Sequence, residues 1–402
     1  MTGALGMDAP SRRLDAALAE RTEWNAAFFT TEAERLASVC HRMAERFARG
    51  GRLVAFGSTP AARSDVRHIA VEFVHPVIVG KRALPAIGLA SEGGSLRLQV
   101  NLLAQPEDIA IGFGAEGEVG AAIDVARERG CLTIAFSDAG AGWQFLPPAP
   151  DPSVRQELVE TLYHVLWELV HVFFEHRGLL EGREAGQVHD TGASSFLYPF
   201  LAEAETDLDS VLEDVRCSVL AKADEVGELR TQTLGENRDE LVAAAAELRR
   251  HFDRGGKLLA LGNGGSATDA MDAVADFRLP PDPGWVRRPA IDLTEDPAIL
   301  TAIANDIGTE AIFARQVIAY GQPGDALLAL STSGNSQNVI EALGEGRRRR
   351  LRTIAMVGYD GGRVADEQLA DHVVVTRSEH IPRIQEAQAS AYHVLRELVE
   401  LA

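Results

Sequence analysis

Hydrophobic residues along this chain follow two patterns, short continuous runs and longer stretches with helical spacing. Helical spacing opens each half of the chain, at about 11–49 and 201–254, and also separates the runs from one another. Continuous apolar runs between helices are typical of parallel strands that are buried on both faces. The pattern predicts an α/β fold in which helices cover both faces of parallel sheets. The expected strands are 53–56, 108–113, 132–136, 257–261, 326–330, 353–357 and 372–376.

The two halves of the chain repeat each other. The segment ARGGRLVAFG at 48–57 matches DRGGKLLALG at 253–262, and YHVLWELV at 163–170 matches YHVLRELV at 392–399. The segments 48–57 and 253–262 lie 205 residues apart. A repeat with a spacing of this size indicates a duplicated domain and not a solenoid, and 402 residues are enough for two hydrophobic cores. Between the halves lies a glycine-bearing stretch with little periodicity. The expected domains are 1–176 and 201–402, joined by a linker at 177–200.

Two apolar runs in the second half end in small and hydroxyl-bearing residues. They read KLLALGNGGS at 257–266 and LLALSTSGNS at 327–336, and a helical pattern follows each. A helix N-terminus that follows such a loop offers backbone N–H groups and a favourable dipole to an anion. The pair predicts a phosphate-binding site. Its expected residues are Asn263, Gly264, Gly265, Ser266, Ser331, Thr332, Ser333 and Ser336.

A dinucleotide-binding fold is the first alternative for the glycine loop. Gly262, Asn263 and Gly264 after a strand begin like the fingerprint of that fold. The third glycine of the fingerprint is missing, and a dinucleotide site would not explain the later Ser/Thr cluster. The sequence therefore favours a phosphate site of another kind.

The second half resembles the sugar isomerase (SIS) domain family, and within it the phosphoheptose isomerases. The resemblance rests on GNGGSATDAMDAVADF at 262–277, AIANDIGTEAIFARQV at 302–317, STSGNSQNVIEAL at 331–343 and RIQEAQASAYHVL at 383–395. It implies conversion of sedoheptulose 7-phosphate into a heptose 7-phosphate, with sugar contacts from Asn305, Asp306 and Gln385. The repeat then predicts two tandem SIS domains that form an intrachain pseudo-dimer.

The resemblance also implies a metal site, commonly for zinc, that is built from two helices. In the first half the matching residues are His68 and Glu72, four apart, with Gln156 and His164, eight apart. Glu72 and His164 would also carry the acid/base chemistry. The alternative set, at the corresponding positions of the second half, is Asp272, Asp276, Gln385 and His393.

The halves differ in what they retain. The first half has Pro60 after its first strand, which removes a backbone N–H, and GAEGE at 114–118, which puts carboxylates where a phosphate would sit. Because SIS sites lie at or near subunit interfaces, we expect a composite site, with phosphate loops from one half and metal and acid/base groups from the other. In a simpler version all the chemistry stays in the second half, with Asp276 and His393 as the acid/base pair.

The composition of the chain excludes some classes of binding partner. A net charge of −20 argues against nucleic acid and anionic membranes, which both need positive potential. Three widely spaced cysteines and a first segment without an apolar core favour the cytoplasm, and family habit suggests a dimer of two-domain chains. The competing class is a non-catalytic SIS protein that only binds a sugar phosphate, because Asp272 and Asp276 depart from the metal-binding pattern.

Overall fold

The computed structural model describes residues 9–77, 81–90, 93–114, 117–175 and 207–401. These residues form two compact units. The C-terminal unit contains the described parts of Met1–Trp24, Asp151–Glu157 and Glu225–Ala402, and the N-terminal unit contains those of Asn25–Pro150 and Leu158–Asp224. The predicted linker at 177–200 lies outside the described residues. None of the helices in the described part of the chain has an apolar stretch long enough to cross a bilayer.

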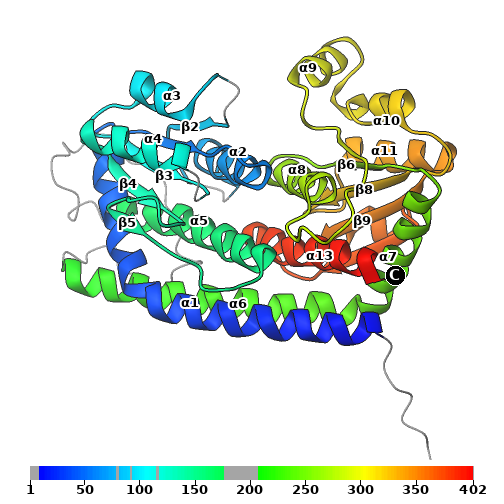
Figure 1. Cartoon of the computed structure of the whole chain (residues 1–402), viewed down its shortest axis with the longest axis horizontal. Helices are drawn as coiled ribbons and strands as arrows, with labels where there is room; N and C mark the ends of the chain where they lie inside the picture. The colour runs from blue at the N-terminus through cyan, green and yellow to red at the C-terminus, as the bar shows by residue number, and fades with distance from the viewer. Residues whose placement is uncertain (1–8, 78–80, 91–92, 115–116, 176–206, 402) are drawn as a thin grey trace, which may run out of the picture. The chain divides into compact units, whose positions relative to one another are not determined.

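The N-terminal unit is built on a five-stranded parallel sheet with the strand order β2-β1-β3-β4-β5. The helices and strands of the first half, labelled in Figure 1, are α1 (Ala9–Ala48), β1 (Leu53–Phe56), α2 (Pro60–Val74), β2 (Ala86–Leu89), α3 (Leu96–Leu103), β3 (Ile109–Gly112), α4 (Gly117–Glu128), β4 (Leu132–Ala135), β5 (Trp143–Gln144) and α5 (Pro152–Glu175).

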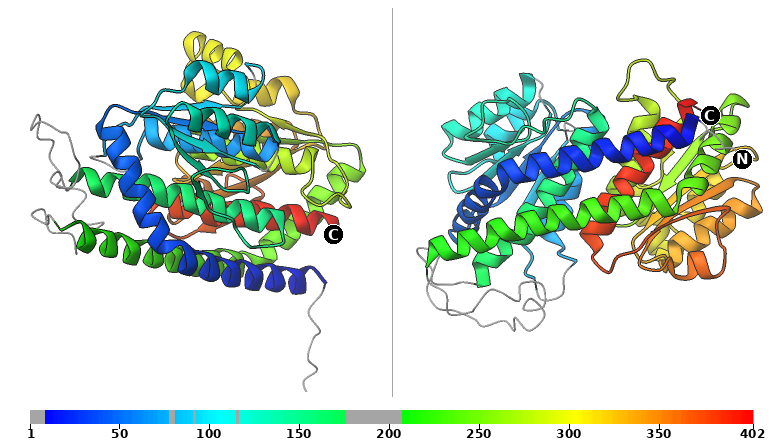
Figure 2. Two further views of the ribbon diagram at one scale, coloured as in Figure 1. Left: turned by 60° about the vertical axis from the view of Figure 1, so that its left-hand side comes forward. Right: turned by 90° about the horizontal axis from the view of Figure 1, so that it is seen from below.

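The C-terminal unit carries a second parallel sheet with the order β7-β6-β8-β9-β10. Helices lie along both faces of this sheet (Figure 2). The elements of the second half are α6 (Leu208–Glu236), α7 (Arg238–Asp253), β6 (Leu258–Leu261), α8 (Gly265–Arg278), β7 (Ala290–Asp292), α9 (Pro297–Asp306), the 3-10 turn η2 (Thr309–Ala311), α10 (Ala314–Tyr320), β8 (Ala326–Ser331), α11 (Gln337–Arg348), β9 (Arg352–Gly358), α12 (Gly362–Asp366), β10 (His372–Thr376) and α13 (Ile381–Leu401).

Both sheets have the same strand order, which confirms the prediction of a duplicated α/β domain. All seven predicted strands are present, with ends that shift by at most one residue. The sequence analysis missed β2, β5 and β7, which are short strands at the edges of the sheets. It also placed no break within the helical stretch at 201–254, which contains α6 and α7. Asn237 separates them, because its side chain bonds the carbonyls of Thr233 and Val375 and accepts the N–H of Val375.

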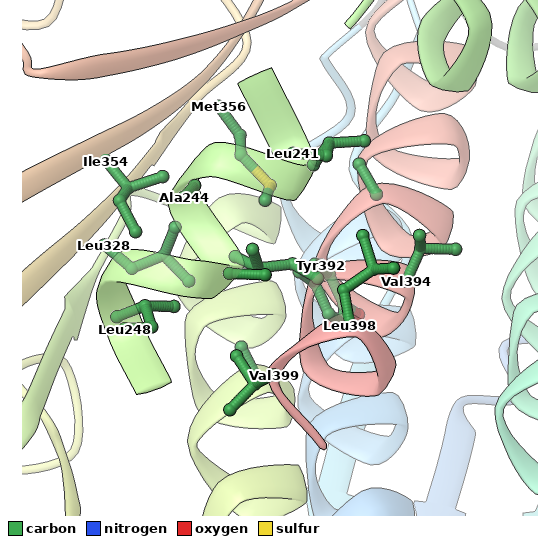
Figure 3. Close-up of a cluster of buried hydrophobic side chains, with 14 of the residues drawn as sticks. Leu241, Ala244, Leu248, Leu328, Ile354, Met356, Tyr392, Val394, Leu398 and Val399 are labelled. Carbon is green, nitrogen blue, oxygen red and sulfur yellow. The ribbon is translucent and has the colours of Figure 1, made fainter. Parts of the chain in front are cut away.

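The strands of the C-terminal sheet alternate their side chains between two cores. Leu258, Leu328 and Met356 face α7, α8 and α13, in the cluster shown in Figure 3. Leu259 and Leu327 face the opposite layer, which includes α10 and α11. Burying a side chain of this size contributes about 1.5–3 kcal/mol, so both faces stabilise the sheet. Because the strands are parallel and helices cover both faces of the sheet, the loops at the carboxyl ends of the strands, including those after β6 and β8, lie at one edge of the sheet.

The two sheets share a side-chain device at the start of their first strands. Asp108 accepts the N–H groups of Arg52 and Gln105 and pairs with the Arg52 guanidinium at 2.7 Å. Asp325 does the same for Lys257 and Gln322, with a Lys257 Nζ–Asp325 Oδ2 distance of 2.5 Å. These matching contacts follow the QPED and QPGD segments of the repeat. The duplication is therefore visible in individual hydrogen bonds as well as in topology.

Candidate functional site

The glycine loop and the Ser/Thr loop follow β6 and β8, which are neighbours in the C-terminal sheet. The chain order reverses between these two strands, because β7 lies beside β6 and β9 lies beside β8. In open α/β sheets, ligands bind outside the carboxyl ends of strands at such a switch point. The structure thus brings the two predicted loops to the position in the fold that is best suited to a ligand.

The first loop passes directly into α8. Gly264 has φ +57° and ψ −125°, a conformation that L side chains rarely adopt, and α8 begins at the next residue. Asn263 is exposed, whereas Ser266 is buried in the first turn of α8. The N-terminus of this 14-residue helix therefore opens onto an exposed loop. That is the arrangement which binds anions.

The second loop is held in shape by its own hydroxyls. The N–H of Gly334 donates to Ser331 Oγ at 3.2 Å, and the N–H of Asn335 donates to Ser333 Oγ at 3.2 Å. Gly334 has φ +62°, and a Cβ atom there would lie 2.0 Å from the carbonyl oxygen of Gly361. The loop therefore packs directly on the backbone that precedes α12, and Gly334 permits this approach.

An amide pair joins the two loops. Asn263 Nδ2 donates to Asn338 Oδ1 at 2.9 Å, and Asn338 Nδ2 donates to Asn263 Oδ1 at 2.9 Å. Asn338 lies in the first turn of α11 and was not among the predicted site residues. Its only sequence signal was its place two residues after Ser336. The pair fixes the spacing between the two helix N-termini that face the loops.

The predicted sugar contacts lie on two other helices of the same unit. Asn305 and Asp306 are exposed at the end of α9, where Asn305 Nδ2 donates to Asp306 Oδ1 at 2.7 Å. Gln385 lies in α13 and is 2% exposed. Its Oε1 atom has no hydrogen-bond partner among the described residues. A buried amide oxygen in this state is suited to receive a polar group of a ligand.

The corresponding loops of the first half have other roles. Thr59 caps α2 by accepting the N–H of Ala62, and Pro60 is the first residue of the helix. Residues 115–116 of the GAEGE segment lie outside the described residues, and the Glu118 carboxylate accepts the N–H of Leu96 at 2.8 Å. Pro60 and Glu118 thus serve helix termini within the N-terminal unit.

Three of the residues implied as metal ligands are buried. His68 and Glu72 lie one turn apart on α2, with His68 Nε2 and Glu72 Oε1 3.9 Å apart. His164 comes from α5, and its Nε2 atom lies 3.3 Å from Nε2 of His68. Gln156 lies two turns before His164 on α5 and is partly exposed. The predicted His68–His164 association is therefore present.

A further carboxylate, which the sequence analysis missed, belongs to this cluster. Glu160 lies on α5 one turn before His164. One ligand atom each from His68, Glu160 and His164 lies within 4.8 Å of the other two, and all three residues are buried. The four-residue spacing to His164 was the available signal for Glu160.

The cluster fits a divalent metal ion. Zn–N distances of about 2.0–2.1 Å in a tetrahedral site put two nitrogen ligands about 3.3–3.4 Å apart, which is the separation of the two histidine nitrogens. Burial, followed by the neighbouring His164, lowers the pKa of His68 well below its usual value. Neutral imidazole is the form that binds metals. The donor set can therefore hold such an ion without a change of protonation at His68.

The alternative set in the second half is an ion-pair network. His393 Nδ1 lies 2.9 Å from Glu157 Oε1, and its Nε2 lies 3.2 Å from Asp272 Oδ2 and 3.6 Å from Asp276 Oδ2. Burial opposes the charged ring. Hydrogen bonds to Asp272 and Glu157 and the charge of Asp276 outweigh it and raise the pKa of His393 well above its usual value. A doubly protonated imidazole has no lone pair for a metal.

Glu157 anchors this network, and it was also missed. It accepts from Arg21 Nε at 3.0 Å and from Ser390 Oγ at 2.5 Å as well as from His393. Burial raises the pKa of Glu157, but Arg21 and His393 reverse this and hold the pKa well below its usual range. Tyr392 donates its hydroxyl to Asp272 Oδ2 at 2.9 Å. The network keeps His393 charged within the C-terminal unit.

The comparisons with known proteins find sequence similarity in the half of the chain that carries the two predicted phosphate loops. The model of the SIS domain family matches residues 223–358. A phosphoheptose isomerase from Chlorobium phaeobacteroides is 41% identical over 213 residues, which are 52% of this chain and 88% of that protein. One from Pelobacter propionicus is 44% identical over 164 residues, which are 39% of this chain and 82% of that protein. About half of this chain or less is matched in each case.

Structural similarity extends over the whole chain. The C-terminal domain of glucosamine-fructose-6-phosphate aminotransferase from Francisella tularensis has a TM-score of 0.59 at 7% identity and covers 100% of this chain and 98% of its own. Tagatose-6-phosphate ketose/aldose isomerase from Escherichia coli has a TM-score of 0.57 at 13% identity, with coverages of 97% and 94%. These similarities show the fold, and the sequence relatives show the family. The chain belongs to the phosphoheptose isomerase family of SIS-domain proteins.

Proposed function

We propose that this protein is an aldose–ketose isomerase that converts sedoheptulose 7-phosphate into a heptose 7-phosphate. The observation that carries the proposal is the pairing of the two loops through Asn263 and Asn338 at the switch point of the C-terminal sheet. Relatives that match this half of the chain over most of their length are phosphoheptose isomerases. The substrate class follows from both together.

The loops between β6 and α8 and between β8 and α11 would hold the phosphate. Backbone N–H groups at two helix N-termini and the hydroxyls of Ser331, Thr332, Ser333 and Ser336 are the donors. A hydrogen bond to a charged group contributes about 1.5–3 kcal/mol, so three or four suffice for a phosphomonoester without an arginine. This also explains how an acidic chain could bind a phosphorylated sugar.

The chemistry needs a base that moves a proton between C1 and C2 and an acid that protonates the carbonyl oxygen. We assign Glu72 as the base and His164 as its partner. Both are buried on helices that fix their positions. A bound zinc ion would polarise the substrate carbonyl or hydroxyls. His68 and His164 would hold it, and the remaining ligand is considered in the next subsection. That the loops and this cluster act on one substrate is a prediction from the sequence.

A second candidate is a protein that binds the sugar phosphate without converting it. The ion pairs of His393 with Glu157 and Asp272 favour it, because they leave the half that carries the loops with a neutralised network at the family's metal position. Both candidates share the phosphate loops. They differ in whether Glu72 and His164 ever act on the sugar.

The proposal also includes the identity of the metal ion, the oligomeric state and the cellular location. Zinc is the proposed ion, and a dimer of two-domain chains is the proposed assembly. A reducing cytoplasm is the proposed location, which the free thiols of Cys40, Cys131 and Cys217 support.

Proton NMR of sedoheptulose 7-phosphate in deuterated buffer tests the function. We expect conversion of the sugar and exchange of a C1 proton, both stopped by a chelator and restored by zinc. Broadened sugar resonances without exchange would favour the binding protein. Absence of both effects, in protein shown to be folded by circular dichroism, would contradict both candidates.

A further inference from the structure

We propose that Glu160 is the third protein ligand of a divalent metal site whose other ligands are His68 and His164. The inference deepens the proposed function and rests on it for the identity of the ion. It departs from the set implied by the family resemblance, in which Glu72 and Gln156 accompany the two histidines. It also separates the residue that holds the metal from the residue that moves the proton.

The geometry selects Glu160. One atom each from Glu160, His68 and His164 lies within 4.8 Å of the other two. The two histidine nitrogens already have the separation of ligands on one ion, at 3.3 Å. Glu160 and His164 are four apart on α5, a spacing that puts both side chains on one face of the helix. Three side chains from two helices thus converge within one unit.

The chemistry of the donor set points the same way. Two imidazoles and one carboxylate form a catalytic zinc set that leaves a coordination position for water or substrate. A carboxylate brings a negative charge that partly neutralises the ion in a buried site, whereas the amide of Gln156 is neutral. Glu160 is 3% exposed and Gln156 is only partly buried. The buried anion is the better ligand.

The internal repeat shows that Glu160 is particular to the first half. If Gln156 and His164 are aligned with Gln385 and His393, the residue that corresponds to Glu160 is Ala389. In the second half, His393 is ion-paired and Ala389 has no ligand atom. The carboxylate is therefore present in the half that has the histidine pair and absent from the half that lacks it.

The proposal assigns proton transfer to Glu72 and metal binding to Glu160. Its carboxylate lies beside His68, at 3.9 Å from Nε2, and is not part of the three-residue cluster. A carboxylate that binds a metal directly is a weak base, because the ion stabilises its ionised form. Assigning the ligand role to Glu160 therefore makes Glu72 a better base.

Metal titration of the full-length chain tests the inference without an activity assay. Protein stripped by a chelator is titrated with Co²⁺, whose visible absorption reports the ligand set, and Zn²⁺ affinity is measured by competition with a chromophoric chelator. We expect one ion per chain in the wild type. Loss of an outer-sphere partner costs about 10–100-fold in affinity, so Glu160→Gln should cost at least about 100-fold. Glu72→Gln should cost less, about tenfold, at the lower end of that range.

Two further variants keep the result interpretable. Glu160→Asp keeps the charge with a shorter reach and should bind one ion more weakly than the wild type and more tightly than Glu160→Gln. Gln156→Ala should bind as the wild type does. Wild-type protein that binds no Co²⁺, or Glu160→Gln protein that binds it as tightly as the wild type, would overturn the proposal. Metal binding without sugar conversion would overturn the isomerase alone, and conversion by wild-type protein that binds no Co²⁺ would overturn this inference alone.

Discussion

The side-chain amides of Asn263 and Asn338 donate to and accept from each other at 2.9 Å, and this pair is a direct side-chain link between the glycine loop and the Ser/Thr loop. Each loop is short and follows a buried strand, so its own end is already fixed. The amide pair then sets the distance between the two ends. The phosphate site thus depends on a contact that neither loop determines by itself.

Replacement of Asn338 by alanine should weaken sugar-phosphate binding. The change removes two hydrogen bonds that contribute about 0.5–1.5 kcal/mol each, so we expect Kd to rise by at least about 5-fold and at most about 150-fold in isothermal titration calorimetry. Gln337→Ala is the matched control, because Gln337 bonds Glu341 and Arg363 and not the first loop. Equal losses in both variants would argue against the amide pair as the cause.

Replacement of Gly334 by alanine should damage the second loop. A Cβ atom there meets the Gly361 carbonyl oxygen at 2.0 Å and the backbone has φ +62°, so the loop must shift. We expect loss of measurable phosphate-sugar binding and a lower melting temperature. In contrast, Gly344→Ala on α11 has room for the methyl group and should stabilise the protein by about 0.5–1 kcal/mol. Unchanged binding in Gly334→Ala protein would refute the role of this loop.

Replacement of Glu72 by glutamine should reduce kcat while KM for the sugar phosphate stays close to wild type. Loss of a general base typically costs about 100- to 10,000-fold, and Glu72 is distant in sequence from both loops. Asp276→Asn should remain active. If Asp276→Asn protein is inactive and Glu72→Gln protein is not, the chemistry belongs to the second half, as in the simpler version. Steady-state kinetics on both variants decide between them.

The pH dependence of stability should reveal the buried Asp276. Burial and the adjacent Asp272 raise the pKa of Asp276 to about 7, from 3.8 in an unfolded chain. The folded state then binds more protons between these values, so Asp276 costs stability progressively as pH rises from about 4 to 7. Relative to wild type, Asp276→Asn protein should become more stable over this range, as measured by urea midpoints at pH 4.5 and 8.

The control for this pH experiment is Asp253→Asn. Slight burial opposes ionisation of Asp253, but hydrogen bonds from Arg288 and Arg249 lower its pKa. Asp253 is therefore mostly charged in folded and unfolded chains at both pH 4.5 and pH 8, and the difference from wild type should vary little between these two values. A parallel slope in the two variants would assign the effect to something other than Asp276.

Much of the fold could be predicted because its strands are continuous apolar runs. The seven predicted strands are central or long enough to be recognised, and the repeat of 48–57 at 253–262 indicated two copies of one sheet. β5 and β7 were missed because edge strands of two or three residues carry too little pattern. The break at Asn237 depends on a contact with Val375, which is far away in sequence.

The residues of the candidate site also fall into those that the sequence predicted and those that it did not. The two phosphate loops could be predicted, because small and polar residues directly after an apolar run are a signal that lies within a short stretch of sequence. Glu160, Glu157 and Asn338 could not, because their roles depend on partners from other helices or loops. The sequence showed only that Asp272 and Asp276 of the second half depart from the metal-binding pattern. Only the position of Glu157 beside His393 shows that its imidazole is already held by two carboxylates.

The paired devices at Asp108 and Asp325 bear on how a duplicated chain can change. Both copies keep an aspartate that ties the amino ends of the first and third strands of the sheet, yet the loops at the carboxyl ends differ completely. In each sheet, the aspartate contacts that hold the strands together therefore lie at the amino ends of the strands, and the loops that differ between the copies lie at the carboxyl ends. One copy could exchange its loops without unfolding, and the same separation makes the N-terminal sheet a scaffold on which new loops can be grafted.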